Sequence, residues 1–331
     1  MKGLYGWTLL ILLFAFSTSQ GQTVTSAQSG PWNDPLTWSP QTIPTASNSP
    51  SIVINSGHVV TYDAAVTGGV DQLTIDGELI VNSGVTLTLA NGNGDEITVT
   101  SSGALTNNGS IAFATIPPNR TVIVQGTLNN NGLFQNANAS RLFFNPGSSY
   151  NHMFADGGII PPANWDVAST VNIVGYTSGS TTPPTGLNQV FGNLVWNCPN
   201  QDQAIALNGL GTLNLNIEGD FRVESTGTEA LIYSAGGAGG VANIGGNLQV
   251  TGGVVVWTTG DAAPSTINIG GNLEVSSTGY FLLADDVDLT VNVAGGIILS
   301  DEGSLDLVGS TATTSINLQG DYTHTGGNLY V

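Results

Sequence analysis

The C-terminal half of this 331-residue chain repeats itself about every 25 residues, and this repeat restricts the possible folds more than any other feature. Five segments share one order of residues: apolar, Asn, apolar, any residue, Gly, small or polar, apolar. They span residues 215–221, 242–248, 267–273, 291–297 and 316–322. The intervals between their Asn residues are 27, 25, 24 and 25 residues. A propeller blade takes roughly 40 residues, so the repeat indicates a smaller unit.

The N-terminal half has a related rhythm. A Gly followed two positions later by Leu occurs at Gly77, Gly103 and Gly126, and a second Gly follows each at Gly84, Gly109 and Gly132. Between these glycines apolar and polar residues alternate, as in residues 85–89, which is the period of a half-buried strand. Each unit therefore holds at least two strands separated by a turn.

Units of this size predict an all-β fold, a right-handed parallel β-helix in which each coil contributes three short strands. Successive coils stack at the strand spacing of roughly 4.8 Å, so recurring apolar residues form internal ladders. We expect eight residues of the regular repeats to point inward and stack: Leu215, Ile217, Ile244, Leu248, Ile269, Leu273, Val293 and Leu318.

Residues 1–21 have the features of a signal peptide. Lys2 gives a positive start, residues 9–16 form an apolar run, and small residues precede position 22. The apolar run is shorter than the roughly 20 residues of a membrane helix. We therefore expect export, cleavage and no membrane span afterwards.

The mature chain divides into four regions. Residues 22–65 lack the repeat and are predicted to form an N-terminal cap, 66–140 the first coils, and 200–331 the regular coils. Between them, residues 141–199 are predicted to form irregular coils whose loops carry two Pro-Pro pairs. No capping pattern follows Gly320, so we expect the native product to continue, with other domains of the same longer polypeptide as partners.

Charge excludes one class of partner. Four Lys and Arg oppose 23 Asp and Glu, giving a net charge of −19. Such a chain has no basic surface for nucleic acid or anionic lipid. Cys198 is the single cysteine, so the chain forms no internal disulfide.

Four stretches carry a resemblance to known proteins. Residues 29–38, which contain Trp32 and Trp38, and residues 54–61 resemble the start of the eight-glycine domain of exported β-helical proteins. Residues 150–170 and 191–199 resemble parts of large secreted surface proteins of Bacteroidota that leave by the type nine secretion route. The resemblance implies a secreted, extracellular or cell-surface β-helix that serves as passenger or stalk.

The repeated asparagines allow two interpretations. Asn216, Asn243, Asn268, Asn292 and Asn317 occupy one position in successive coils, which suits either a polar stripe for a ligand or a ladder of side-chain amides. We favour the ladder.

Acidic turns are the candidate metal sites. Asp285 and Asp286 belong to an acidic cluster, and Asp95 lies in a stretch, residues 91–96, that is similar to a calcium loop. Solvated turns are the alternative that we favour, so we expect no cofactor, with Ca²⁺ as the exception to test.

Catalysis is not expected. The three mature arginines, Arg120, Arg141 and Arg222, are far apart in sequence, and His58, His152 and His324 have no metal-ligand spacing. A glycoside hydrolase needs two carboxylates about 5–10 Å apart. Asp285 with Asp306, or Asp286 with Glu302, are the pairs that adjacent coils bring closest to this requirement.

The sequence therefore predicts a non-catalytic structural or adhesive segment of a secreted bacterial cell-surface protein. The alternative is a carbohydrate-binding or polysaccharide-cleaving β-helix with an extracellular polysaccharide as partner. Sugar rings stack on exposed aromatic side chains, and Trp257, Tyr280 and Phe281 are the candidates.

Overall fold

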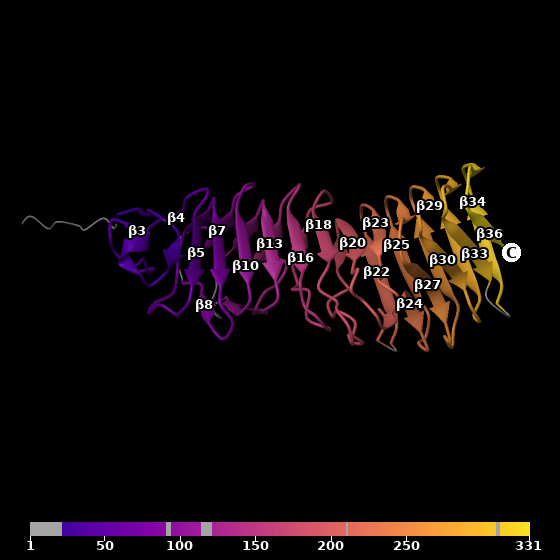
Figure 1. Cartoon of the computed structure of the whole chain (residues 1–331), viewed down its shortest axis with the longest axis horizontal. Helices are drawn as coiled ribbons and strands as arrows, with labels where there is room; N and C mark the ends of the chain where they lie inside the picture. Colours follow the sequence, from indigo (N-terminus) through magenta and orange to yellow (C-terminus); the bar gives the residue numbers. More distant parts are fainter. Residues whose placement is uncertain (1–21, 91–93, 114–120, 210, 309–311) are drawn as a thin grey trace, which may run out of the picture.

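The computed structural model describes residues 22–90, 94–113, 121–209, 211–308 and 312–331, and it is a rod of stacked coils (Figure 1). Within these residues the secondary structure is strands, apart from the short 3-10 helix η1 (Pro35–Thr37). The strands pair in parallel, coil upon coil, except where β3 meets β1. The chain is a right-handed parallel β-helix, as predicted. The predicted signal peptide, residues 1–21, lies outside the described residues.

Two sheets begin at the N-terminal end. The first contains β1 (Val24–Ser26), β3 (Trp38–Ser39), β4 (Ile52–Ile54), β6 (Leu73–Ile75), β9 (Ile97–Val99), β12 (Val122–Val124), β15 (Leu142–Phe144) and β17 (Asn164–Trp165). The second runs the length of the rod through β2 (Gly30–Pro31), β5 (Val59–Tyr62), β7 (Glu78–Val81), β10 (Ala104–Asn107), β13 (Thr127–Asn130), β16 (Ser149–His152), β18 (Thr170–Ile173), β20 (Asn193–Asn197), β23 (Phe221–Ser225), β26 (Leu248–Val250), β29 (Leu273–Val275), β32 (Ile297–Leu299) and β35 (Tyr322–His324).

Three further sheets complete the coils. The third is short: β8 (Thr86–Thr88), β11 (Ser110–Ala112) and β14 (Leu133–Gln135). The fourth contains β19 (Val190–Phe191), β22 (Leu213–Ile217), β25 (Gly240–Ile244), β28 (Ser265–Ile269), β31 (Leu289–Val293) and β34 (Thr314–Leu318). The fifth contains β21 (Ile205–Ala206), β24 (Ala230–Ala235), β27 (Val254–Thr259), β30 (Tyr280–Ala284), β33 (Ser304–Val308) and β36 (Asn328–Tyr330).

Apolar ladders fill the interior. Leu248 pairs with Leu273, and Leu273 with Ile297, so the same strand position recurs in register. Seven of the eight residues predicted to point inward are buried, which confirms the ladder. Leu318 is only half-buried, because it lies in the last coil and no further coil covers it.

The N-terminal cap is shorter than residues 22–65. β4 and β5 already pair in parallel with β6 and β7, so the helical stack begins inside that range. The cap itself is β3, which lies antiparallel beyond β1, with the buried side chains of Trp32 and Trp38. Trp38 Nε1 donates to the carbonyl oxygen of Trp32 over 2.7 Å, and the two rings meet edge to face. Pairing at β4 needs only alternating apolar residues, not the Gly signal of later coils.

The middle of the rod changes its cross-section. The first and third sheets end at β17 and β14, and the fourth and fifth begin at β19 and β21, whereas the second continues throughout. The two predicted Pro-Pro pairs lie between strands in this region. Proline has no N–H for a ladder, so it is accommodated where the old faces stop and the new ones start.

Candidate functional site

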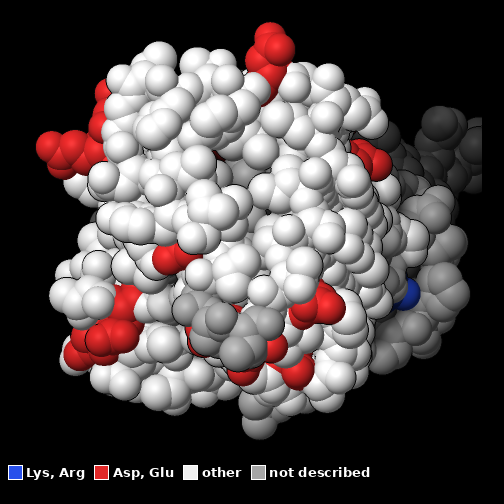
Figure 2. Space-filling model, turned by 90° about the vertical axis from the view of Figure 1, so that its right-hand side faces the viewer, with Lys and Arg blue, Asp and Glu red and all other residues white. Residues whose placement is uncertain are grey.

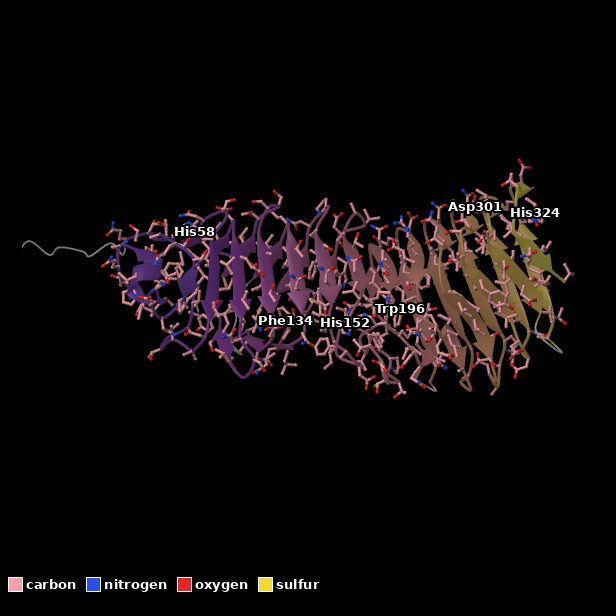
Figure 3. All side chains as sticks on the ribbon, viewed as in Figure 1. His58, Phe134, His152, Trp196, Asp301 and His324 are labelled. Atoms are coloured by element: carbon pink, nitrogen blue, oxygen red, sulfur yellow. The ribbon has the colours of Figure 1, made fainter. Side chains whose placement is uncertain are left out.

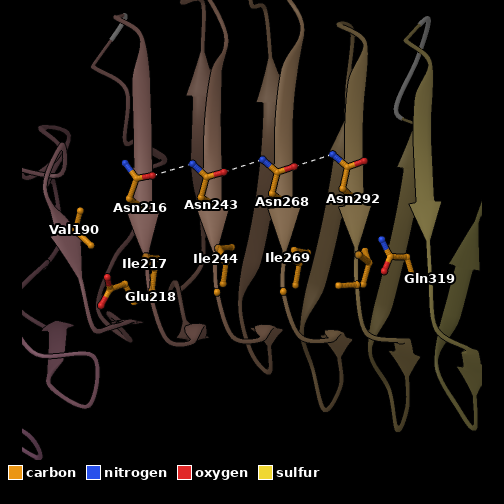
Figure 4. A pocket seen from close by; sticks show the side chains of 14 residues that line it. Val190, Asn216, Ile217, Glu218, Asn243, Ile244, Asn268, Ile269, Asn292 and Gln319 are labelled. Atoms are coloured by element: carbon orange, nitrogen blue, oxygen red, sulfur yellow. Dashed lines mark hydrogen bonds between the residues drawn. The ribbon is translucent and has the colours of Figure 1, made fainter.

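A groove of about 680 Å³ runs along the outer surface of the fourth sheet (Figure 4). Its side wall is the row of outward asparagines at the penultimate position of each strand from β22 to β31. Beneath them lie the last residues of the strands, Ile217, Ile244, Ile269 and Val293, whose side chains are buried in the core. The exposed apolar side chains of the groove are those of Val190 and Ala294, so a polar wall borders a groove with some apolar surface.

The groove is hollow because the first residue after each strand differs in side-chain size from coil to coil. The three middle coils place Gly245, Gly270 and Ala294 there, whereas Glu218 and Gln319 stand at the two ends. A Cβ on Gly270 would meet the carbonyl oxygen of Gly245 at 2.3 Å, so the turn of this coil has room only for glycine, whereas the next coil takes Ala294 at the same position. The absent or small side chains at Gly245, Gly270 and Ala294 leave the groove open above them.

The asparagines form a directed amide ladder. Asn243 Nδ2 donates to Asn216 Oδ1 over 2.9 Å, and the bond repeats at Asn268 and Asn292 over 2.8 Å each (Figure 4). A fourth bond, from Asn317 Nδ2 to Asn292 Oδ1 over 2.7 Å, continues the ladder. The ladder predicted from the sequence is therefore confirmed. It begins at Asn216 because its register partner in the coil before is Val190, which cannot accept a hydrogen bond.

The groove is almost uncharged. Among the described residues that line it, Glu218 carries the one formal charge. The end view of the rod in Figure 2 shows acidic side chains scattered over the face and one basic side chain at its margin. A neutral ligand meets no electrostatic barrier in the groove, whereas a polyanion is repelled by a chain of net charge −19.

The predicted sugar-stacking residues do not form an exposed platform. Trp257 and Phe281 are both 0% exposed, so the expectation that they face solvent is wrong. Their place in the alternation of β27 and β30 points them into the core, where Trp257 packs against Tyr233. Tyr280 points outward, and its hydroxyl donates to Asp306 over 3.0 Å. Burial, followed in size by the interaction with Asp306, raises the pKa of Tyr280 to about 12.

The calcium candidates hold turns together. Asp285 accepts a hydrogen bond from the Thr259 hydroxyl and Asp286 one from the Gly260 amide, so both tie their turn to the coil before. Asp95 accepts from the Thr121 hydroxyl. Across the described ranges, no group of three or more His, Cys, Asp or Glu side chains is placed to hold a metal ion. Residues 91–93 of the calcium-like stretch lie outside those ranges.

The two candidate catalytic pairs differ in how the coils place their members. Asp306 lies within β33 opposite Leu282, whereas Asp285 follows the end of β30. Asp286 and Glu302 lie in turns at different corners of the coil, the first after β30 and the second before β33. After burial, Asp306 and, more weakly, Asp285 both raise the pKa of the Tyr280 hydroxyl, so the first pair lies around one side chain, whereas the second is divided between two corners.

The histidines and arginines are equally dispersed. His58, His152 and His324 lie near the beginning, the middle and the end of the rod (Figure 3). Arg222 donates to Gln249 over 3.0 Å and pairs with Glu224 at 3.4 Å. Arg120 lies outside the described residues.

Sequence reasoning missed a buried polar chain in the second sheet. Asn107 Nδ2 donates to Asn130 Oδ1, Asn130 Nδ2 to the Tyr150 hydroxyl, and that hydroxyl to His152 Nδ1, at 2.9, 3.0 and 3.3 Å. His152 Nε2 then donates to the carbonyl of Gly157 over 2.8 Å, since a carbonyl can only accept. Burial lowers the pKa of His152 to about 4. The sequence signal for this polar chain was an Asn or His at an inward position of the strand, two residues after a buried ladder residue.

Comparisons with known proteins add little. No family model matches the chain, and no curated protein matches it. One solved structure is similar, the crystal structure of a TibC-catalysed, hyper-glycosylated TibA fragment (residues 55–350), at 17% identity, with a TM-score of 0.36 over 94% of this chain and 95% of that one. The fold assignment rests on the strand pairing described above.

In the part of the chain that the structure describes, no helix is long and apolar enough to cross a bilayer.

Proposed function

We propose that this chain is a non-catalytic structural or adhesive segment of a secreted bacterial cell-surface protein. The observation that carries the proposal is the unbroken second sheet, whose 13 strands from β2 to β35 stack along the rod. At the usual strand spacing they extend over roughly 60 Å. Such a rod holds whatever precedes and follows it at a fixed separation.

Three further features support this role. The signal-like segment at residues 1–21 favours export, and the resemblance to eight-glycine and Bacteroidota surface proteins favours a place outside the cell. The acids, histidines and arginines that we considered for catalysis serve turns and coil contacts at separate places. A solenoid without a catalytic centre acts through its length and its surface.

Surface labelling tests the location. An antibody raised against residues 22–331 is applied to intact and to permeabilised cells of the source organism, with a cytoplasmic protein as the control. We expect labelling of intact cells, and loss of the signal when intact cells are treated with protease. Labelling only after permeabilisation would contradict the proposal.

An in-frame deletion tests the mechanical role. Removing residues 222–248, one coil measured from β23 to β26 in register, shortens the rod by one strand spacing and leaves the stack continuous. We expect the shortened protein to remain on the surface. If the rod presents an adhesive domain, cells that carry the shortened protein bind less well to the surfaces that the parent strain colonises.

Carbohydrate binding is the second candidate function. The observation that favours it is the groove along the fourth sheet, which has the volume and neutral amide wall of a ligand site. The polysaccharide-cleaving form of this alternative has less support, because Asp285 and Asp306 are offset along the strand direction and Asp286 and Glu302 lie at different corners of the coil.

A further inference from the structure

We propose that the groove along the amide ladder binds a linear, uncharged, hydroxyl-rich polymer, a neutral glycan lying parallel to the rod axis. The inference deepens the adhesive role and rests on it, since an adhesive rod needs a ligand surface. Its place is the fourth sheet, not the aromatic residues that the sequence suggested.

The ladder leaves hydrogen-bonding capacity facing outward. A side-chain amide has two N–H groups and two lone pairs. Each inner rung, Asn243, Asn268 or Asn292, spends one N–H and one lone pair on its neighbours. Every coil therefore offers one donor and one acceptor from a neutral group, at a repeat of roughly 4.8 Å. Hydroxyl groups both donate and accept, so they match such an array.

The size and ends of the groove fit a short run of sugar rings. The volume of about 680 Å³ lies within the usual range of roughly 300–1,000 Å³ for ligand sites. Val190, which is 50% exposed, and the exposed Ala294 give apolar surface against which the C–H face of a ring can lie. Glu218 and Gln319 stand near the two ends of the row, as Figure 4 shows, and the straight row of rungs suits an unbranched chain.

Two other classes of ligand fit less well. An extended peptide binds a sheet mainly through an open edge, but β25, β28 and β31 each have a hydrogen-bonded strand on both sides. A polyanion meets Glu218 and the net charge of −19 without a compensating cation among the described lining residues. A neutral polymer with dense hydroxyl groups remains.

Calorimetric titration of residues 22–331 tests the site. The probes are the neutral hexasaccharides of the cello, laminari, manno and xylo series, with hexagalacturonate as the charged comparison. We expect at least one neutral probe to bind with a Kd of about 0.1–1 mM. Hexagalacturonate is expected to bind more weakly than that probe.

Ala294→Gln fills the groove without changing the backbone, because Gln319 occupies the same position in the next coil. We expect this variant to weaken binding about tenfold. Ala262→Gln is the matched control, since Ala262 is also exposed but lies in the turn between β27 and β28. It should bind like the parent chain.

A second pair of variants distinguishes loss of ligand binding at the ladder from a general loss of stability. Asn268→Ala removes a rung inside the groove, and Asn151→Ala removes one from the similar ladder in the second sheet, where Asn151 Nδ2 donates to Asn129 Oδ1 over 2.7 Å. Only the first should lose affinity, with both folded by circular dichroism. The inference is overturned if no neutral probe binds below about 5 mM, if Ala294→Gln and Ala262→Gln lose affinity alike, or if hexagalacturonate binds best. Surface labelling of intact cells would still stand in each case.

Discussion

The side chain of Trp257 stacks on that of Tyr233 in the coil before it, with ring centroids 4.4 Å apart and planes inclined by 13°. Both rings are inside the rod, and Phe281 of the next coil meets Trp257 edge to face at 5.9 Å. Three successive coils thus form one aromatic column. The Nε1–H of Trp257 has no hydrogen-bond partner there, so its contribution comes from packing alone.

Truncating this column should be costly. We expect Trp257→Ala to lower the free energy of unfolding by about 3–5 kcal/mol, the usual range for a buried aromatic side chain. Trp257→Phe should cost much less, because it retains a ring and removes an unpartnered N–H. Chemical denaturation of both variants measures the difference. Equal losses would show that the stack with Tyr233 does not depend on the ring.

A separate prediction concerns the contribution of the aliphatic ladder to stability. Leu273 is buried between Leu248 and Ile297, and we expect Leu273→Ala to cost about 2–5 kcal/mol. Val241→Ala, at a position 37% exposed in the fourth sheet, is the control and should cost less than about 0.5 kcal/mol. A loss below that value at Leu273 would refute the inward ladder.

His152 should make the fold sensitive to acid. Burial lowers its pKa from 6.5 to about 4, so the unfolded chain binds more protons between these values. The contribution of His152 to the free energy of unfolding is therefore fully present above pH 6.5. It decreases as the pH drops and is lost once the pH has fallen through about 4. The shift corresponds to about 3 kcal/mol.

Urea unfolding across this pH range measures the effect. His152→Gln should flatten the slope between pH 6.5 and 4, because glutamine does not titrate. His324→Gln, in the last coil, is the matched control and should retain the slope. An unchanged slope in His152→Gln would assign the acid sensitivity to other groups.

The purified chain should not cleave acidic or neutral polysaccharides. We expect no turnover of pectin, alginate or hyaluronan with or without Ca²⁺, since Asp285 and Asp306 are offset along the strand direction and Asp286 and Glu302 lie at different corners. Reducing-end assays measure it. Reproducible turnover that disappears in Asp306→Asn or Asp286→Asn would overturn the prediction.

The last coil should promote association. Tyr322, Leu329 and Tyr330 are 44, 36 and 49% exposed, and β34, β35 and β36 each have one neighbouring strand. An open edge with apolar residues is a template for pairing. We expect residues 22–331 to associate with increasing concentration, as measured by sedimentation velocity.

Charge at that edge should reduce the association. Leu329→Lys combined with Tyr330→Lys places two charges on β36, whereas Leu36→Lys, at an exposed position beside the capped end, is the control. Only the first variant should become more monomeric. A parent chain that stays monomeric at high concentration would contradict the prediction.

The sequence by itself determined the fold class and the register. The Asn-to-Asn interval sets the length of a coil, and alternation sets which face of each strand is buried, so Leu248, Leu273 and the amide ladder followed from pattern alone. Both signals are local, because a strand has a period of two and a coil repeats on itself. Residues 22–65 had alternation without the Gly signal, and there the cap boundary was missed.

Only the tertiary structure decided which residues share a surface. Trp257 follows two residues after Val255, so alternation allowed it to face inward, but no local pattern indicated the aromatic column that receives it. The groove depends on Gly245, Gly270 and Ala294 lying side by side while Glu218 and Gln319 stand at the ends. In sequence these residues are about 25 positions apart, and stacking brings them to neighbouring rungs. The size of one side chain relative to its neighbours above and below is a property of the stack, not of any single coil.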